Sequence, residues 1–137
     1  MVNDSRVPMV NEGRVQVRRL EVNQQTIDPG VAAVQVSGEL DLASVGKLEA
    51  SVERALRRGC AQLVIDFSRC GFIDSTVLSL LVDLQLRLGN SGRRRFAVVA
   101  ENQPLQVLRL TALDREIPVF GSVPEALRAL EVTANDS

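Results

Sequence analysis

The sequence has no histidine, no tryptophan and no tyrosine among its 137 residues. Without histidine, neither a Ser-His nor a Cys-His catalytic pair can form. Ser75 then has no evident general base, and Asp41, Asp66 and Asp74 are explained more simply as caps and turn residues. No stretch resembles a glycine-rich phosphate-binding loop. We therefore expect a protein that is not an enzyme, has no catalytic residues and uses no cofactor.

Aromatic residues are scarce, and neither sign of charge predominates. Aromatics make up 3% of the chain, and 16 basic residues nearly balance 17 acidic ones. Proteins that bind single-stranded nucleic acid stack bases on exposed rings, and those that bind duplexes carry a basic field. We therefore expect no nucleic acid partner. The basic run at residues 93–95 is interpreted as a solvated turn before a strand, with contact to an acidic partner as the alternative.

Cysteines and long apolar runs are also rare. Cys60 and Cys70 flank an expected strand over residues 63–66, which separates its ends by about 3.3 Å per residue, so no internal disulfide is expected. Two cysteines without histidine make no zinc site, and a redox-sensing role for the thiols remains an alternative. No run reaches the roughly 18 apolar residues of a membrane span, and residues 1–13 are too polar for a signal peptide. These features indicate a cytoplasmic protein without membrane insertion.

The sequence alternates between two hydrophobic periods. Hydrophobic residues make up 45% of the chain, enough for one aliphatic core. Short apolar runs predict strands, and apolar residues at helical spacing predict helices. The expected strands cover residues 15–22, 31–36, 62–67, 95–100 and 117–120, and the expected helices cover residues 43–58, 75–88, 104–113 and 123–131.

This order predicts a single α/β domain over residues 14–131, between flexible tails at residues 1–13 and 132–137. Alternating strands and helices favour a mostly parallel central sheet of about five strands with about four helices. The turn at residues 28–30 (Asp-Pro-Gly) joins the first two strands in a hairpin. The first strand is therefore expected at an antiparallel edge. Asp41 or Ser44 is expected to cap the first helix.

Ser75 stands where a buried strand gives way to a helix. The first backbone N–H groups of a helix lack partners within it, and the helix dipole adds partial positive charge there. A phosphate on Ser75 would find donors and a favourable field, and would add about −1.5 to −2 charges to the neighbouring surface. A partner docked on that surface would be repelled. The plainer alternative is that Asp74 or Ser75 is only an N-cap, worth about 1 kcal/mol.

The helix over residues 75–88 carries more apolar residues than one buried face requires. Val82 and Leu86 project near the direction of Ser75, at about 100° per residue. Two explanations stay open: a deeply buried central helix, or a partner-binding ridge that runs from Ser75 along the helix.

Three segments together resemble the STAS domain family. Residues 72–76 (Phe-Ile-Asp-Ser-Thr), which follow residues 64–68 (Val-Ile-Asp-Phe-Ser), look like the family signature, and residues 38–41 (Gly-Glu-Leu-Asp) look like its second characteristic segment. The order of elements is similar over nearly the whole chain. Anti-sigma factor antagonists belong to this family.

The resemblance implies a regulatory switch. The unphosphorylated antagonist would bind an anti-sigma factor and release the sigma factor. The anti-sigma factor is often also a serine kinase, which would phosphorylate Ser75, and a metal-dependent serine phosphatase would reset the switch. ATP and Mg²⁺ would belong to those partners. The expected partner-binding residues are Asp41, Asp74, Ser75, Thr76, Val77, Val82 and Leu86.

One position departs from the family pattern. The family usually has glycine where this chain has Val77, and a branched side chain there is expected to stand where a partner backbone would approach. The alternatives are a divergent STAS module that binds without phosphorylation and a soluble STAS subunit of a lipid-transport ATPase. A second copy of the chain is also open as a partner.

Overall fold

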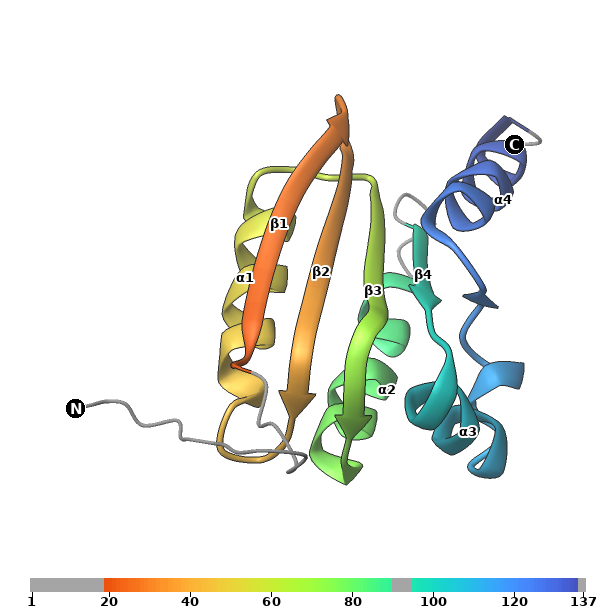
Figure 1. Ribbon diagram of the computed structural model, residues 1–137. Coiled ribbons are helices and arrows are strands. Elements are labelled where there is room, and N and C mark those ends of the chain that lie inside the picture. Colours follow the sequence, from red (N-terminus) through yellow and green to blue (C-terminus); the bar gives the residue numbers. More distant parts are fainter. Residues whose placement is uncertain (1–18, 90–94, 136–137) are drawn as a thin grey trace.

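The computed structural model describes residues 19–89 and 95–135, and it shows a five-stranded sheet with four helices (Figure 1). The predicted tail at residues 1–13, the start of the first predicted strand and Arg93 and Arg94 lie outside the described residues. The strands are β1 (Glu21–Asp28), β2 (Val31–Leu40), β3 (Gln62–Ile73), β4 (Arg95–Val99) and β5 (Val119–Phe120). The helices are α1 (Val45–Arg57), α2 (Ser75–Gly89), α3 (Asn102–Leu110) and α4 (Val123–Asn135), with a 3₁₀ turn η1 (Leu113–Arg115).

The strands follow one another across the sheet in the order β1-β2-β3-β4-β5. The β1–β2 pair is antiparallel, and the other three pairs are parallel. Gly30 adopts a positive φ of 79° in the turn between β1 and β2, a conformation that glycine adopts readily. The predicted mixed α/β sheet with an antiparallel edge strand is therefore confirmed.

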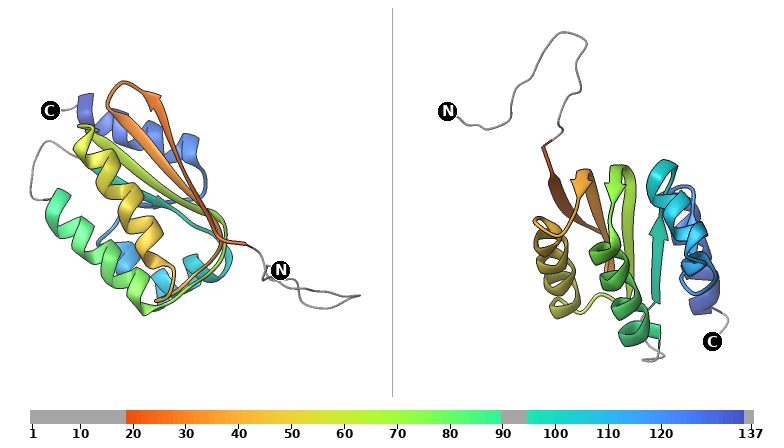
Figure 2. Two further views of the ribbon diagram at one scale, coloured as in Figure 1. Left: turned by 90° about the vertical axis from the view of Figure 1, so that its left-hand side faces the viewer. Right: turned by 90° about the horizontal axis from the view of Figure 1, so that it is seen from below.

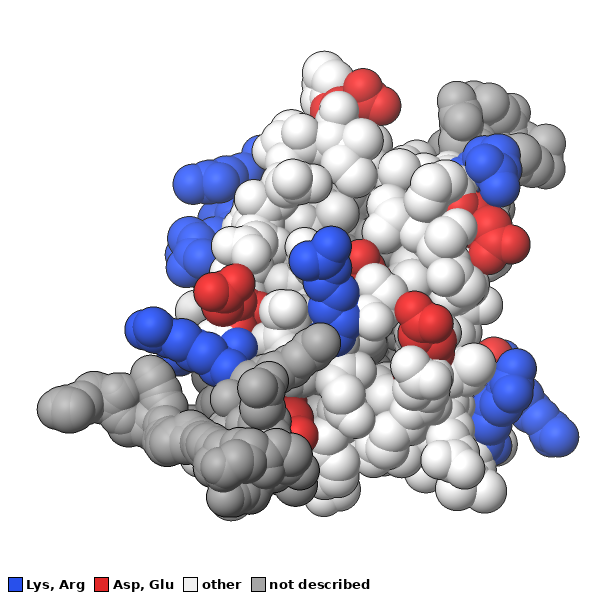
Figure 3. Space-filling model, in the orientation of Figure 1, with Lys and Arg blue, Asp and Glu red and all other residues white. Residues whose placement is uncertain are grey.

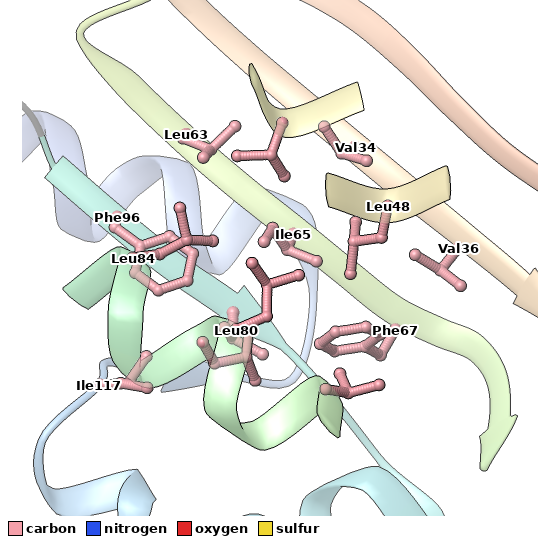
Figure 4. Close-up of a cluster of buried hydrophobic side chains, with 14 of the residues drawn as sticks. Val34, Val36, Leu48, Leu63, Ile65, Phe67, Leu80, Leu84, Phe96 and Ile117 are labelled. Atoms are coloured by element: carbon pink, nitrogen blue, oxygen red, sulfur yellow. The ribbon is translucent and has the colours of Figure 1, made fainter. Parts of the chain in front are cut away.

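The sheet separates two cores. Helices α1 and α2 cover one face, and α4 covers part of the other (Figure 2). Alternate residues of β3 serve the two faces, since Leu63, Ile65 and Phe67 join the larger core and Val64 joins the smaller one. Figure 4 shows the larger core, in which aliphatic side chains of the strands meet those of α1 and α2. This packing fixes where α2 begins.

Strand β3 is much longer than predicted. The prediction that this strand ends at residue 67 is wrong, because β3 spans 12 residues and ends at Ile73. The added residues lie beside the second half of β2, with Ser37 paired to Arg69 and Leu40 paired to Ile73. Two register shifts accompany this stretch, as bulges do where polar residues stay in a strand. Pairing with a neighbouring strand outweighs the local preference for a turn.

Other boundaries differ at the ends of elements. β1 is described from Glu21 to Asp28 rather than over residues 15–22, and α3 begins at Asn102, before the predicted residue 104. Helix α4 ends at Asn135, beyond the predicted residue 131. Helix ends are set by packing and caps that a local pattern does not contain.

Both cysteines are free thiols inside the protein. Cys60 belongs to the larger core, and Cys70 lies within β3. Burial raises the pKa of the Cys70 thiol. A buried thiol with a raised pKa is a poor nucleophile, so the structure offers no support for a redox-sensing role.

Candidate partner-binding surface at the start of helix α2

Asp74 is the residue that caps α2. Its Oδ1 accepts hydrogen bonds from the backbone N–H of Thr76 at 3.0 Å and of Val77 at 3.4 Å, and from the Thr76 hydroxyl. These bonds satisfy N–H groups of the first turn, which have no partner inside the helix. Of the two cap candidates left open by the sequence, Asp74 therefore fills the role.

Ser75 does not cap helix α2. It is the first residue of α2 and is exposed to solvent. Within the described part of the chain, its hydroxyl makes no recorded hydrogen bond, so it does not hold the fold together. The hydroxyl is open to an approaching enzyme, and it stands beside the positive end of the helix dipole.

The Asp74 carboxylate is charged at neutral pH. Its hydrogen bond from the Thr76 hydroxyl and those from the backbone N–H groups of Leu42, Val77 and Thr76 lower its pKa, because they stabilise the ionised form. The surface beside Ser75 therefore already carries a negative charge. A second anionic group there would make the local field strongly negative.

The loop between β2 and α1 is joined to the same site. Asp41 Oδ1 accepts hydrogen bonds from the Ala43 N–H and the Ser44 hydroxyl, each at 3.0 Å. Of the two cap candidates for α1, Ser44 makes no side-chain cap bond, and Asp41 organises the turn before the helix. The Leu42 N–H donates to Asp74 Oδ2 at 3.0 Å, which places the Leu42 side chain, 73% exposed, beside the start of α2.

The end of β3 is held from the other side by α3. The Gln103 amide accepts the Ile73 N–H at 2.9 Å and donates to the Ile73 carbonyl at 3.1 Å. This two-point contact satisfies the last backbone groups of β3, as a neighbouring strand would. The residue before Asp74 is thereby fixed, and with it the direction in which α2 leaves the sheet.

Exposed side chains continue from Ser75 along one side of α2. Ser75, Ser79, Val82 and Leu86 follow the spacing of one helix face, and all are exposed. Val82 is 37% exposed and Leu86 is 62% exposed. The surplus apolar residues Val82 and Leu86 are therefore exposed rather than deeply buried.

An ion pair marks where α2 meets α1 at the surface. Arg87 donates to both carboxylate oxygens of Glu53, at 2.8 and 3.4 Å. The hydrogen bond from Arg87 lowers the pKa of Glu53 and raises that of Arg87. Both side chains are partly exposed, so the pair orients the two helices more than it stabilises them.

Val77 does not belong to this surface. Its side chain is 0% exposed and packs in the larger core, so the prediction that it faces a partner is wrong. Residue 77 lies two positions after Ser75, on the opposite side of the helix. A branched side chain there does not obstruct a partner. Thr76 is half-buried, with its hydroxyl bonded to Asp74.

Three residues of the site escaped the sequence analysis. In the sequence, Leu42 stands out only as an apolar residue in a polar turn, and Ser79 only by its helical spacing from Ser75. Gln103 had no signal at all, because its contact with Ile73 spans 30 residues.

We call Leu42, Ser75, Ser79, Val82 and Leu86 the α2 surface.

Within the described residues, no helix is long and apolar enough to cross a membrane. The same residues contain no group of three His, Cys, Asp or Glu side chains placed to hold a metal ion.

The chain matches the family model described as "Mlab, STAS domain" over residues 23–124. The anti-sigma-F factor antagonist RsfB of Mycobacterium tuberculosis is 30% identical over 99 residues, which are 72% of this chain and 80% of that protein. The anti-sigma F factor antagonist of Paenibacillus polymyxa is 29% identical over 107 residues, or 77% of this chain and 91% of that protein.

A solved structure agrees with these relatives. The crystal structure of an anti-sigma factor antagonist from Mycobacterium paratuberculosis has a TM-score of 0.76 and 30% identity, and the match covers 82% of this chain and 95% of that chain. The chain therefore belongs to the STAS domain family. The relatives named above are anti-sigma factor antagonists, a class of regulatory binding proteins rather than enzymes.

Proposed function

We propose that the protein is an anti-sigma factor antagonist that binds an anti-sigma factor through the α2 surface while Ser75 is unphosphorylated, and so releases a sigma factor in the cytoplasm. Phosphorylation of Ser75 weakens this binding. The observation that carries the proposal is that Ser75 is exposed and free of the cap role, which Asp74 fills. The names of the relatives support the kind of partner.

The α2 surface has the composition of a docking site. Leu42, Val82 and Leu86 expose apolar area beside the hydroxyls of Ser75 and Ser79. A few well-packed side chains near the centre of an interface supply most of its binding free energy. Burying them against a partner requires the polar groups between them to be neutral or paired, because an unpaired buried charge is costly.

A phosphate on Ser75 would weaken binding, because it would place a charge among the side chains that the partner buries. It would add about −1.5 to −2 charges next to the ionised Asp74 carboxylate. The partial positive charge at the start of the helix favours the modified chain, so the fold persists. The partner, in contrast, would have to bury a doubly charged group or lose contact with the helix start. The kinase and a serine phosphatase are supplied by other proteins.

The proposal is tested with substitutions of Ser75. S75A is expected to bind the anti-sigma factor and to resist phosphorylation, whereas S75D and S75E are expected to bind more weakly. A61D is a matched control, because Ala61 is exposed and precedes the start of β3, at the opposite end of that strand from Ser75. It adds the same charge but should bind like the parent.

The partner itself is identified by purifying the tagged chain from its own cells and identifying the bound protein. Recovery of an anti-sigma factor supports the proposal. Recovery of a lipid-transport ATPase would contradict it in favour of a transport subunit. If S75E bound the recovered anti-sigma factor as tightly as the parent, Ser75 would not be the switch.

A further inference from the structure

Strand β1 forms the edge of the sheet beyond β2. In the part of the chain that the structure describes, β1 pairs with β2 alone and forms one edge of the sheet (Figure 1). Alternate residues of an edge strand turn their N–H and C=O groups away from the sheet. Lysine and proline, which often protect such edges, are absent from Glu21–Asp28. The register shift that could twist the edge away lies only at its far end, between Thr26 and Asp28.

A groove runs between this edge and α1. Its lining includes Glu21 and Asn23 from β1, and Lys47, Ala50 and Arg54 from α1, with Arg19 just before the strand. Lys47, Ala50 and Arg54 follow the spacing of one helix face. The groove therefore has the edge strand β1 along one wall and one face of α1 along the other.

The charge of the groove is mainly positive. Its lining includes three cations, Arg19, Lys47 and Arg54, and one carboxylate, that of Glu21. No ion pair of these three cations with another described residue is recorded. Figure 3 shows Lys and Arg side chains along the side of the molecule where Figure 1 places α1 and β1.

The acidic residues of α1 lie on another side of the helix from the groove. Glu49 and Glu53 lie toward α2, where both act on the Arg87 guanidinium and raise its pKa. Lys47 and Arg54 lie toward β1. The positive charge of the groove is therefore not neutralised by the acidic residues of the same helix.

We propose that this groove binds an extended, acidic segment of a partner protein, which adds to β1 as a further strand. Main-chain hydrogen bonds to the free edge hold the segment, and its carboxylates face Lys47, Arg54 and Arg19. A second copy of the chain fits less well, because it would bring the same cations against each other. A nucleic acid cannot pair with a strand edge in this way.

This inference is independent of the α2 surface, and it is tested on the full-length chain. The probe is a fluorescein-labelled peptide of about eight alternating Glu and Val residues, which matches the length of β1. Fluorescence anisotropy measures its affinity, and NMR-detected hydrogen exchange measures protection of the β1 amides. We expect binding, slower exchange of β1 amides in the complex, and weaker binding when NaCl rises from about 0.05 M to about 0.5 M.

Two variants give the matched comparison. K47E/R54E should lower the affinity by about tenfold or more, because it reverses the charge of one wall. R109E/R115E makes the same change in net charge at exposed positions on α3 and the following turn, and should leave the affinity unchanged.

Several results would overturn the inference. The inference would be wrong if the acidic peptide did not bind, or if a Lys-Val peptide of the same length bound equally well. An unchanged affinity in K47E/R54E would also contradict it. Binding without protection of β1 amides would show a purely electrostatic contact and contradict strand addition. Displacement of the peptide by a short oligothymidylate with equal affinity would assign the groove to nucleic acid instead.

Discussion

The Asp74 carboxylate accepts the backbone N–H of Leu42 at 3.0 Å, across 32 residues of sequence. The other oxygen of the same carboxylate caps α2. One side chain therefore joins the loop before α1 to the first turn of α2. Together with the pairing of Leu40 and Ile73 in the sheet, this group holds Leu42 beside Ser75 on the α2 surface.

Removing the Asp74 carboxylate should destabilise the protein. D74A leaves N–H groups at the start of α2 and at Leu42 without an acceptor, so we expect a loss of about 1 kcal/mol in the free energy of unfolding. D74N keeps a side-chain oxygen and should lose less. Urea denaturation measures both. Equal destabilisation by the two variants would show that capping by the oxygen is not what Asp74 contributes.

The pH dependence of stability should also report on Asp74. Its pKa is lowered in the folded state, so its ionised form adds stability that is fully present above the unfolded pKa of about 4. That stability is lost as the pH falls through the lower folded pKa. The difference in unfolding free energy between the parent and D74N should therefore shrink from pH 7 toward pH 3. A constant difference over this range would mean that the charge of Asp74 is not involved.

Gly38 is required by a close approach of the backbone. Its φ is 104°, and a Cβ atom there would lie 2.9 Å from the Arg19 carbonyl oxygen. G38A should therefore destabilise the fold by about 1 to 3 kcal/mol. G46A is the control, because a Cβ atom at Gly46 meets no neighbouring atom within 4 Å. Thermal unfolding compares the two, and an unaffected G38A would contradict the close contact.

The exposed leucines of the α2 surface should matter for binding and not for folding. L42A/L86A is expected to weaken binding of the anti-sigma factor by about fivefold or more, since each truncation removes apolar area from the interface. Its stability should change by no more than about 0.5 kcal/mol, because both side chains are exposed. L110A removes a similarly exposed leucine, 81% exposed, on α3. If L110A and L42A/L86A weakened binding equally, the α2 surface would not be the docking site.

The order of strands and helices follows from the local hydrophobic pattern. Runs such as residues 62–67 and the helical spacing in residues 75–88 are local signals, and each predicted its element. The second half of β3 was missed because its polar residues stay in a strand only through pairing with β2. Tertiary pairing of this kind leaves no trace in a short window of sequence.

The candidate site was predicted only in part, because a local sequence pattern does not show which distant residues the fold brings together. Ser75, Val82 and Leu86 were predicted to lie near one side of α2, because their spacing in the sequence matches the helical period. The spacing does not show whether that face is exposed or buried. Val77 was assigned to the surface from the family resemblance, although it is buried. Leu42 and Gln103 reach the site only through long-range hydrogen bonds.

The most direct test measures the affinity of the anti-sigma factor for two forms of the protein by isothermal titration calorimetry. One form is unphosphorylated, and the other is fully phosphorylated on Ser75, as verified by mass spectrometry. The added charge beside Asp74 predicts an affinity about tenfold or more lower for the phosphorylated form. Equal affinities of the two forms would contradict the account.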